Sequence, residues 1–369
     1  MSWTAWIDER LDAIRARGQW RTMRDLATGR PETRLVAEGI DVVSFASNDY
    51  LGLTQHPKVI AAATAALERY GTGSGASRIV VGARPVHREL EAALAAWKGT
   101  EAALLFPTGY MANVGVLTAL ASDGDTVIVS DELNHASIID GARLARGRVV
   151  VQRHGDLDHL DAILRDAPRA LVVTDTVFSM DGDVAPVEEL LAVCRRHGAL
   201  LVLDEAHAVL GPPTPKGDDV VVVGTLSKAL GSVGGFVAAS QRVVDLLRNT
   251  ARSFIFTTAP APADMAAALA AVEIVSTEEG EALRARLRAN VERVCPGHPS
   301  PIVPVIVGDE RDAVAASEAL LSRGLLVPAI RPPTVAPGTS RLRVALSAAH
   351  TSSQVDHLMS ALSELGLHR

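Results

Sequence analysis

Hydrophobic positions along the chain form short unbroken runs that alternate with stretches of helical periodicity. Each run ends in polar or glycine residues, and the runs lie at 102–106, 126–130, 148–152, 170–174, 199–203, 220–223 and 235–239. Strands with so little alternation are buried on both faces, and the helices between them serve as crossover connections. The pattern therefore predicts an α/β fold in which a mainly parallel seven-stranded sheet lies between helices.

The segments that flank this sheet predict two further parts. Residues 1–28 have apolar side chains at helical spacing and predict an amphipathic helix. After residue 262 an alanine-rich helix leads into about one hundred residues of a different pattern, typical of a smaller C-terminal α/β domain. We expect an N-terminal arm of helix and short strands at 1–43, a large domain at 44–262 and the small domain at 263–369.

Composition narrows the functional classes. The 36 basic and 43 acidic residues give a net charge of -7 without long runs of one sign, which disfavours nucleic acid or an anionic membrane as the main partner. Two cysteines, Cys194 and Cys295, are too few for a disulfide framework or a four-thiolate metal site, and we expect no metal. The N-terminus lacks the apolar core of a signal peptide, and no apolar run is long enough to span a bilayer. The expectation is a cytoplasmic protein.

Chemically suggestive side chains follow two neighbouring strands, at the sheet edge where such folds bind ligands. Asp204 and His207 lie directly after the run 199–203, and Lys228 follows the run 220–223 among small residues. A carboxylate in that position is costly without a positive partner, and an enclosed lysine amine is activated for Schiff-base chemistry. Taken singly, these residues are as well explained by a helix cap, a core histidine and a surface lysine. Their combination after neighbouring strands indicates a functional site far more specifically than any one of them does.

This combination matches the needs of pyridoxal phosphate. The cofactor requires an acid at its pyridine nitrogen, a donor near its phenolic oxygen, a lysine for the covalent link and a cradle for its phosphate. Residues 107–113 follow a strand and open a helix, so their backbone N–H groups are suited to bind an anion. Thr225 could add a hydroxyl to that cradle. A glycine turn before a helix and a threonine at a strand end are, by themselves, ordinary structural features.

Longer motifs then indicate a family. They span nearly the whole chain, as SNDYLGL at 47–53, GTGSG at 71–75, NHASI at 134–138, DTVFSMDGD at 175–183, DEAH at 204–207, GTLSKALG at 224–231 and AIRPPTVAPGTSRLR at 329–343. In these stretches the chain resembles the α-oxoamine synthases, the acyl-transferring branch of the fold-type I pyridoxal-phosphate enzymes with the aspartate aminotransferase-like fold. The DEAH and TLSK segments are typical of the superfamily, and the block at 329–343 separates one family within this branch from its aminoketone-forming relatives.

The resemblance implies roles around the reacting end of the cofactor. Lys228 would form the covalent link and later move the Cα proton, and Asp204 would pair with the pyridine nitrogen. His207 and Ser179 would contact the side of the phenolic oxygen. His135 would stack on the ring, although without the resemblance it is also explained as a buried, hydrogen-bonded histidine.

The resemblance also implies a phosphate site and a dimer. Thr225, Gly109 and Tyr110 would hold the phosphate and the ring edge. Thr257 or Thr258 would reach the phosphate in the other subunit, because this family builds its active sites at a homodimer interface. The match leaves open which of the two threonines does so.

Substrate contacts are implied in the same way. Asn48 and Arg343 would hold the carboxylate of the amino acid, for which an arginine provides a two-pronged clamp. Arg21 and Thr334 would face the acyl chain. Arg341 lies two positions before Arg343, on the same side of a predicted strand, so geometry alone does not choose between them. The family match selects Arg343.

The reaction implied is the decarboxylative condensation of L-alanine with a pimeloyl thioester. Acylation of glycine, as in aminoketobutyrate ligase or aminolevulinate synthase, is the alternative within the class. An aminotransferase shares the aspartate and lysine but lacks the block at 329–343, and a dinucleotide oxidoreductase would need a G-x-G-x-x-G segment after the first buried strand. The sequence leaves open whether the acyl carrier is coenzyme A or a carrier protein, and which acyl length is preferred.

Three positions depart from the family pattern. Ala208 follows DEAH where a glycine is usual, the loop at 211–219 is shortened, and Ala336 interrupts the usual proline run. None of these departures removes a residue with an implied catalytic role. The short loop leaves open how the entrance for the acyl donor is closed.

Overall fold

The computed structural model describes residues 1–367, and its centre is a seven-stranded sheet. The strand order is β3-β9-β8-β7-β6-β4-β5, and β9 is antiparallel to both of its neighbours while the others are parallel. The strands are β3 (Ala102–Phe106), β4 (Thr126–Asp131), β5 (Arg148–Gln152), β6 (Arg169–Asp175), β7 (Leu200–Asp204), β8 (Val220–Thr225) and β9 (Gly235–Ala239). The prediction of a mainly parallel α/β sheet at these positions is confirmed.

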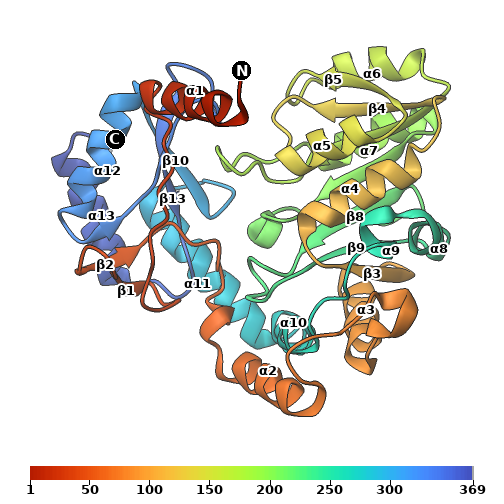
Figure 1. The fold of residues 1–369 in the computed structure, drawn as a ribbon, viewed down its shortest axis with the longest axis horizontal. Coiled ribbons are helices and arrows are strands. Elements are labelled where there is room, and N and C mark those ends of the chain that lie inside the picture. Colours follow the sequence, from red (N-terminus) through yellow and green to blue (C-terminus); the bar gives the residue numbers. More distant parts are fainter. Residues whose placement is uncertain (368–369) are drawn as a thin grey trace.

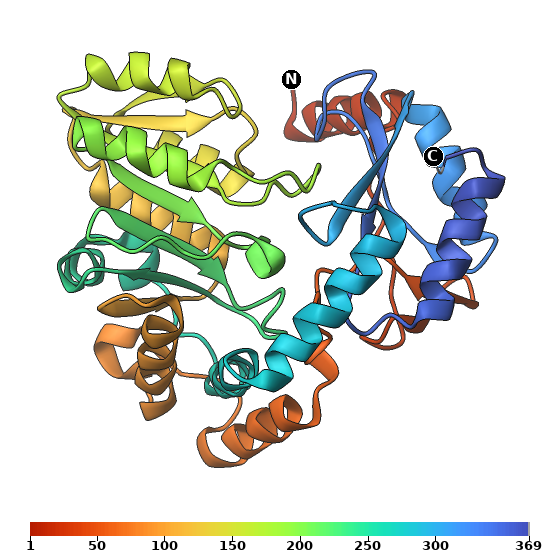
Figure 2. The same cartoon turned by 180° about the vertical axis from the view of Figure 1, so that it is seen from behind.

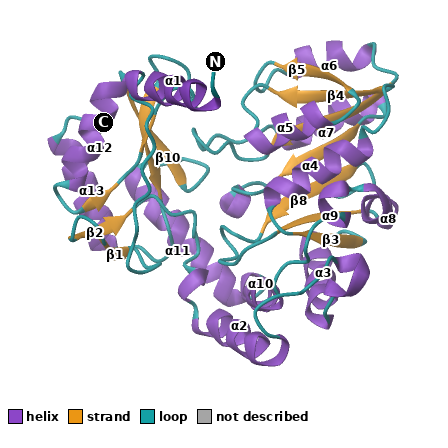
Figure 3. Cartoon of the chain, viewed as in Figure 1, coloured by secondary structure: helices purple, strands orange, loops and turns teal. Residues whose placement is uncertain are grey.

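Helices cover both faces of this sheet (Figure 3). They are α3 (Pro85–Lys98), α4 (Gly109–Leu120), α5 (Ala136–Leu144), α6 (Leu157–Arg165), α7 (Val187–His197), α8 (Gln241–Thr250) and the short α9 (Arg252–Ile255). Successive strand residues such as Leu104 and Leu105 belong to two separate hydrophobic clusters, one on each face. Continuous apolar runs are therefore required, because both sides of a strand are buried.

The edge strand β5 departs from this rule. Val149 and Val151 are 42% and 58% exposed, although the run 148–152 resembles the buried strands in sequence. β5 pairs on one side only, with β4. The prediction of burial on both faces is wrong for this strand because burial depends on what covers it.

The remaining strands form two small sheets on the other side of the molecule (Figures 1 and 2). One has the order β1-β2-β11 and the other β10-β13-β12. The strands are β1 (Glu32–Leu35), β2 (Ile40–Ser44), β10 (Ile302–Gly308), β11 (Leu325–Leu326), β12 (Ala329–Ile330) and β13 (Ser340–Ala345). Because β11 pairs with β2, the N-terminal segment joins the C-terminal part of the chain in one sheet. The three-part division predicted from sequence stays a prediction, and its last two residues lie outside the described range.

The other helices surround these small sheets or connect them to the large one. They are α1 (Trp3–Ala16), α2 (Pro57–Tyr70), α10 (Pro262–Val275), α11 (Glu278–Val294), α12 (Glu310–Leu321) and α13 (Ser352–Glu364), with short turns of helix at Leu53–Gln55, Arg78–Gly82 and Ala208–Leu210. Helix α10 packs against α2 and α3. The helix predicted over residues 1–28 is shorter in the structure. Helix α1 ends at Ala16, because Gly18 just beyond it adopts a positive φ of 63° and turns the chain out of the helix. No residue of α1 is buried, and Trp3 is 78% exposed.

Candidate active site

Seven of the predicted site residues line one cavity of about 200 Å³ at the carboxyl ends of the central strands. Parallel strands bring their carboxyl ends to the same edge, so residues that follow β6, β7 and β8 meet there. The lining includes the predicted residues Gly109, Tyr110, His135, Asp204, His207, Thr225 and Lys228. Within residues 1–367 no group of three or more His, Cys, Asp or Glu side chains is arranged to hold a metal ion.

A chain of hydrogen bonds runs from Lys228 to Arg343. Lys228 Nζ lies 2.7 Å from His207 Nε2, and His207 Nδ1 lies 2.6 Å from the Tyr50 hydroxyl. Tyr50 donates to Asn48 Oδ1 at 3.0 Å, and Arg343 Nη2 donates to the same oxygen at 3.2 Å. A hydroxyl has one proton, so Tyr50 accepts from Nδ1–H, and the free Nε2 of a neutral imidazole accepts from the lysine amine. The imidazole therefore orients the amine of Lys228.

The pKa shifts of His207 and Lys228 agree with this hydrogen-bond arrangement. Burial lowers the pKa of His207 well below its usual value, and the charges of Lys228 and Arg343 lower it further. Burial also lowers the pKa of Lys228, with Arg343 adding to the shift and the carboxylates of Asp204 and Asp175 opposing it. The result is a neutral histidine beside a lysine that gives up its proton more readily than a solvated one.

Asp204 lies at the end of β7 and is buried. Its Oδ2 accepts from Asn113 Nδ2 at 2.7 Å, and its Oδ1 accepts from the Ala206 amide at 2.9 Å. Asn113 Nδ2 also donates to Ser137 Oγ at 2.9 Å, whereas Asn113 Oδ1 is buried without a partner in the described structure. A buried carboxylate with few donors is suited to receive a cationic N–H from a ligand in the cavity.

His135 caps the start of α5 and lines the cavity. Its Nδ1 lies 2.7 Å from Ser137 Oγ, and its backbone N–H donates to Asp175 Oδ2 at 2.7 Å. Burial lowers the pKa of His135, with Asp204 opposing that shift and Lys228 adding to it. Burial and the neighbouring charge of Asp204 raise the pKa of Asp175 well above its usual value. A neutral, anchored imidazole can therefore present its flat face to a ring.

The first turn of α4 is suited to bind an anion. Thr108 caps the helix, and the N–H groups of Gly109 and Tyr110 have no acceptor within the helix. A Cβ on Gly109 would lie 3.2 Å from Thr225 Cβ, so a larger residue would crowd this end of the cavity. Ser227, which also lines the cavity, places its hydroxyl 2.7 Å from that of Thr225.

The two arginines of β13 differ in their partners. Both are buried and both reach the turn at 177–184, as the alternation of the strand predicts. Arg341 forms an ion pair with Asp181, which compensates its charge. Arg343 donates from Nε to the Ser179 carbonyl at 2.6 Å and from Nη2 to Asn48 Oδ1 at 3.2 Å, and both of these partners are neutral. The positive charge of Arg343 is therefore available to a ligand.

Besides Asn48 and Arg343, five predicted residues lie outside the cavity lining. The backbone carbonyl of Ser179 accepts a hydrogen bond from Arg343 Nε. The structure does not bring Arg21, Thr257, Thr258 and Thr334 into the cavity; Arg21, Thr258 and Thr334 are exposed. Their roles, which involve the acyl chain or a second subunit, stay predictions.

Sequence reasoning gave no individual role to six polar residues of the site. These are Tyr50, Thr108, Asn113, Ser137, Asp175 and Ser227; Thr108 and Asn113 lie in the predicted anion-binding segment 107–113, and the others lie within recognised motifs. Asp175 follows the buried run 170–174 just as Asp204 follows 199–203. A search for polar residues directly after each buried run would have found it.

The site fits pyridoxal 5'-phosphate. Asp204 can receive the pyridine N–H, Lys228 provides an oriented amine, the start of α4 can bind the phosphate, and the unpaired Asn113 oxygen leaves a polar atom for a ligand. Fold and site together define a fold-type I pyridoxal-phosphate enzyme of the α/β class.

Comparison with known proteins agrees with this class of enzyme. The sequence model of the family described as "Aminotransferase class I and II" matches residues 40–362. An 8-amino-7-oxononanoate synthase of Methylobacterium sp. (strain 4-46) is 52% identical over 340 residues, which are 90% of this chain and 89% of the relative. Another, of Methylobacterium nodulans, is 50% identical over 370 residues, 98% and 97% of the two chains. The chain belongs to the aminotransferase class I and II family and, within it, to the 8-amino-7-oxononanoate synthases.

Solved structures confirm the fold. A serine palmitoyltransferase of Sphingomonas wittichii aligns with a TM-score of 0.88 and 33% identity, over 99% of this chain and 98% of that one. A serine palmitoyltransferase of S. paucimobilis, with bound pyridoxal phosphate and myriocin, aligns with a TM-score of 0.90 and 32% identity, over 99% and 100%. An 8-amino-7-oxononanoate synthase structure from Francisella tularensis aligns at 24% identity with a TM-score of 0.73, which supports the fold alone.

Proposed function

We propose that this chain condenses L-alanine with a pimeloyl thioester to form 8-amino-7-oxononanoate, carbon dioxide and the free thiol, a step of biotin biosynthesis. In this acyl transfer a bond forms between the alanine Cα and the thioester carbonyl carbon. The thiol leaves with a proton, and the alanine carboxylate leaves as carbon dioxide. The observation that supports this best is the uncompensated charge of Arg343, joined through Asn48, Tyr50 and His207 to the amine of Lys228.

The residues would divide this chemistry as follows. When bound, pyridoxal phosphate withdraws electrons from the amino-acid Cα and so lowers the barrier to removing its proton. Asp204 would hold a proton at the pyridine nitrogen, and His135 would cover one face of the ring. Lys228 Nζ would remove the Cα proton and later return one, with His207 keeping the amine in place. Arg343 would bind the alanine carboxylate.

The phosphate would be bound at the start of α4. The N–H groups of Gly109 and Tyr110 point from the positive end of a helix, and the hydroxyls of Thr225 and Ser227 lie beside them. This end of the cavity anchors the group and leaves the acid, the amine and the arginine to act on the substrate.

The second substrate and the assembly are part of the same proposal. We propose a cytoplasmic homodimer with shared active sites, in which Thr257 or Thr258 reaches the phosphate of the other subunit. Arg21 and Thr334 would face the acyl chain. Among residues 1–367 no helix is long and apolar enough to cross a membrane.

The decisive experiment is mass analysis of the products. Purified protein with pyridoxal phosphate is incubated with L-alanine, glycine or L-serine and with pimeloyl or palmitoyl thioesters of coenzyme A, and with a pimeloyl carrier protein. We expect 8-amino-7-oxononanoate from alanine and a pimeloyl thioester, and no product with Lys228→Ala. Preferred use of glycine or serine, or of the palmitoyl chain, would replace the proposed substrates. Transamination without carbon–carbon bond formation would overturn the reaction class.

A further inference from the structure

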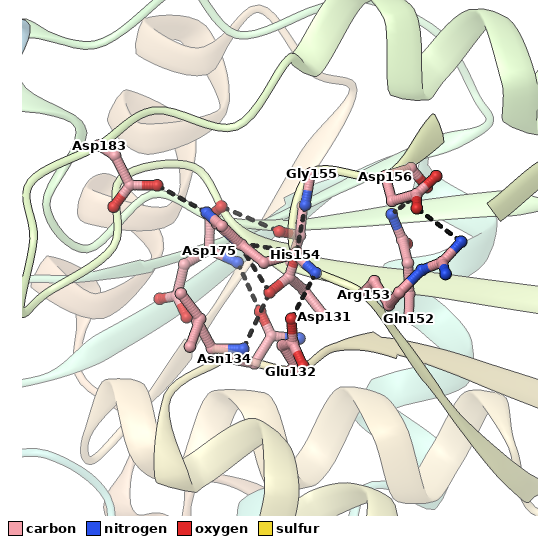
Figure 4. Close-up of polar contacts among 12 residues, drawn as sticks. Asp131, Glu132, Asn134, Gln152, Arg153, His154, Gly155, Asp156, Asp175 and Asp183 are labelled. Atoms are coloured by element: carbon pink, nitrogen blue, oxygen red, sulfur yellow. Dashed lines mark hydrogen bonds and ion pairs between the residues drawn. The ribbon is translucent and has the colours of Figure 1, made fainter. Parts of the chain in front are cut away.

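A histidine outside the cavity lies between two carboxylates (Figure 4). His154 Nδ1 is 3.0 and 3.1 Å from the two carboxylate oxygens of Asp131, and its Nε2 is 2.9 Å from Asp183 Oδ2. Asp131 ends β4, His154 follows β5, and Asp183 lies in the turn at 177–184. Phe178 of the same turn packs edge-on against the imidazole, with ring centroids 4.5 Å apart. The histidine thus joins the sheet to this turn.

The charged form of His154 fits these contacts. A neutral imidazole has one N–H, so one ring nitrogen would direct a lone pair at a carboxylate. Burial lowers the pKa of His154, but the hydrogen bonds and charges of Asp131 and Asp183 outweigh burial, and the net shift is upward. Two further acids lie nearby: Glu132 accepts the His154 backbone N–H at 2.9 Å, and the charge of Asp131 also acts on Asp175. Two basic groups contact the turn at 177–184 from other elements: Arg341 of β13 pairs with Asp181, and His298 lies beside Gly182.

The turn at 177–184 connects this histidine to the amino-acid site. Its base is closed by the pairing of Val177 with Val184 and by a bond of 3.0 Å from the Phe178 amide to the Asp183 carbonyl. Its tip provides the Ser179 carbonyl, which accepts from Arg343 Nε at 2.6 Å. A displacement at the base would therefore move the acceptor that orients Arg343.

We propose that His154 is a positioning residue for amino-acid binding: its imidazolium fastens Asp183 to Asp131, and the turn at 177–184 then holds the Ser179 carbonyl where it orients Arg343. This role rests on the proposed function in one respect, the assignment of the substrate carboxylate to Arg343. It requires no contact between His154 and substrate or cofactor.

The first test measures L-alanine binding to the holoenzyme from the change in cofactor absorbance. His154→Asn should raise the Kd for alanine about tenfold, or about 1.4 kcal/mol, and change kcat much less. Asp183→Asn, which keeps the side-chain shape and leaves Asp131 paired with the histidine, should show the same defect. His357→Asn, at an exposed position of α13, is the matched control and should bind alanine normally.

The pH dependence of alanine binding tests whether the charged form of His154 is the one that holds the turn. His154 has a raised pKa in the folded protein, so its contribution is complete below the usual histidine pKa and is lost as pH rises through the folded value. The advantage of the wild type over His154→Asn in alanine binding should therefore fade with rising pH. An advantage that does not change with pH would overturn the proposal.

Hydrogen exchange gives a readout independent of activity. The amides of Phe178 and Gly182 are bonded within the turn, and they should exchange faster in the holoenzyme of His154→Asn and Asp183→Asn than in the His357→Asn control. Unchanged exchange together with normal alanine binding in both variants would refute the role of His154. If Arg343→Ala also leaves alanine binding unchanged, the assignment of Arg343 in the proposed function is what fails. If only Arg343→Ala weakens binding, the inference on His154 fails alone.

Discussion

Replacing Arg343 by alanine tests the assignment of the amino-acid carboxylate directly. In the structure, Arg343 uses one N–H for the Ser179 carbonyl and one for Asn48, out of five that a guanidinium possesses. N–H groups on both terminal nitrogens therefore remain for a two-pronged contact with a carboxylate. Arg341, by comparison, is already paired with Asp181.

The expected loss follows from that count. A hydrogen bond to a charged group contributes about 1.5–3 kcal/mol, so two such bonds contribute about 3–6 kcal/mol. At about 1.4 kcal/mol per factor of ten, Arg343→Ala should weaken alanine binding by about 10²- to 10⁴-fold. Arg343→Lys should recover only part of this, because a single ammonium lacks the planar fork.

The assay is a titration of the holoenzyme with L-alanine, followed by the thioester dependence of the initial rate. Cofactor content should be unchanged, and the KM for the thioester should change less than the Kd for alanine. Removing the arginine charge should also raise the pKa values of Lys228 and His207, since that charge lowers both. A normal Kd in Arg343→Ala with a large defect in Arg341→Ala would refute the reasoning and assign the carboxylate to the other arginine.

Three further changes probe the rest of the molecule. Lys228→Ala should abolish turnover and leave the cofactor bound without a covalent link; a borohydride-stable adduct on another lysine of the wild type would contradict this. Asp204→Asn should lower kcat by several powers of ten, on the order of 4–7 kcal/mol at about 1.36 kcal/mol per decade, and near-normal turnover would place the acid elsewhere. Glu91→Gln should lower the free energy of unfolding by about 3–5 kcal/mol in urea titrations, because it leaves the largely buried Arg78 without its carboxylate; a loss below about 1 kcal/mol would show that the pair matters little.

The sequence by itself determined the strand positions and the reacting end of the site. Strands buried on both faces need continuous apolar residues, and that requirement is local enough to be visible in the runs from 102 to 239. Ligand-binding residues lie directly after such strands, so Asp204, His207 and Lys228 could be predicted together. A continuous apolar run does not indicate which other elements cover the strand, and the sequence therefore did not predict the exposure of β5.

Only the tertiary structure decided how distant segments complete the site. Asn48 meets Arg343 across 295 residues of chain, and the pattern of either segment contains no information on that contact. Alternation along β13 places Arg341 and Arg343 on the same side, so their sequence environments are equivalent. Their charges become different only when the turn at 177–184 packs against the strand, since it gives Arg341 a carboxylate and Arg343 a neutral carbonyl. Electrostatic compensation depends on distances of a few ångströms in space, and those distances are set by packing between elements rather than by order along the chain.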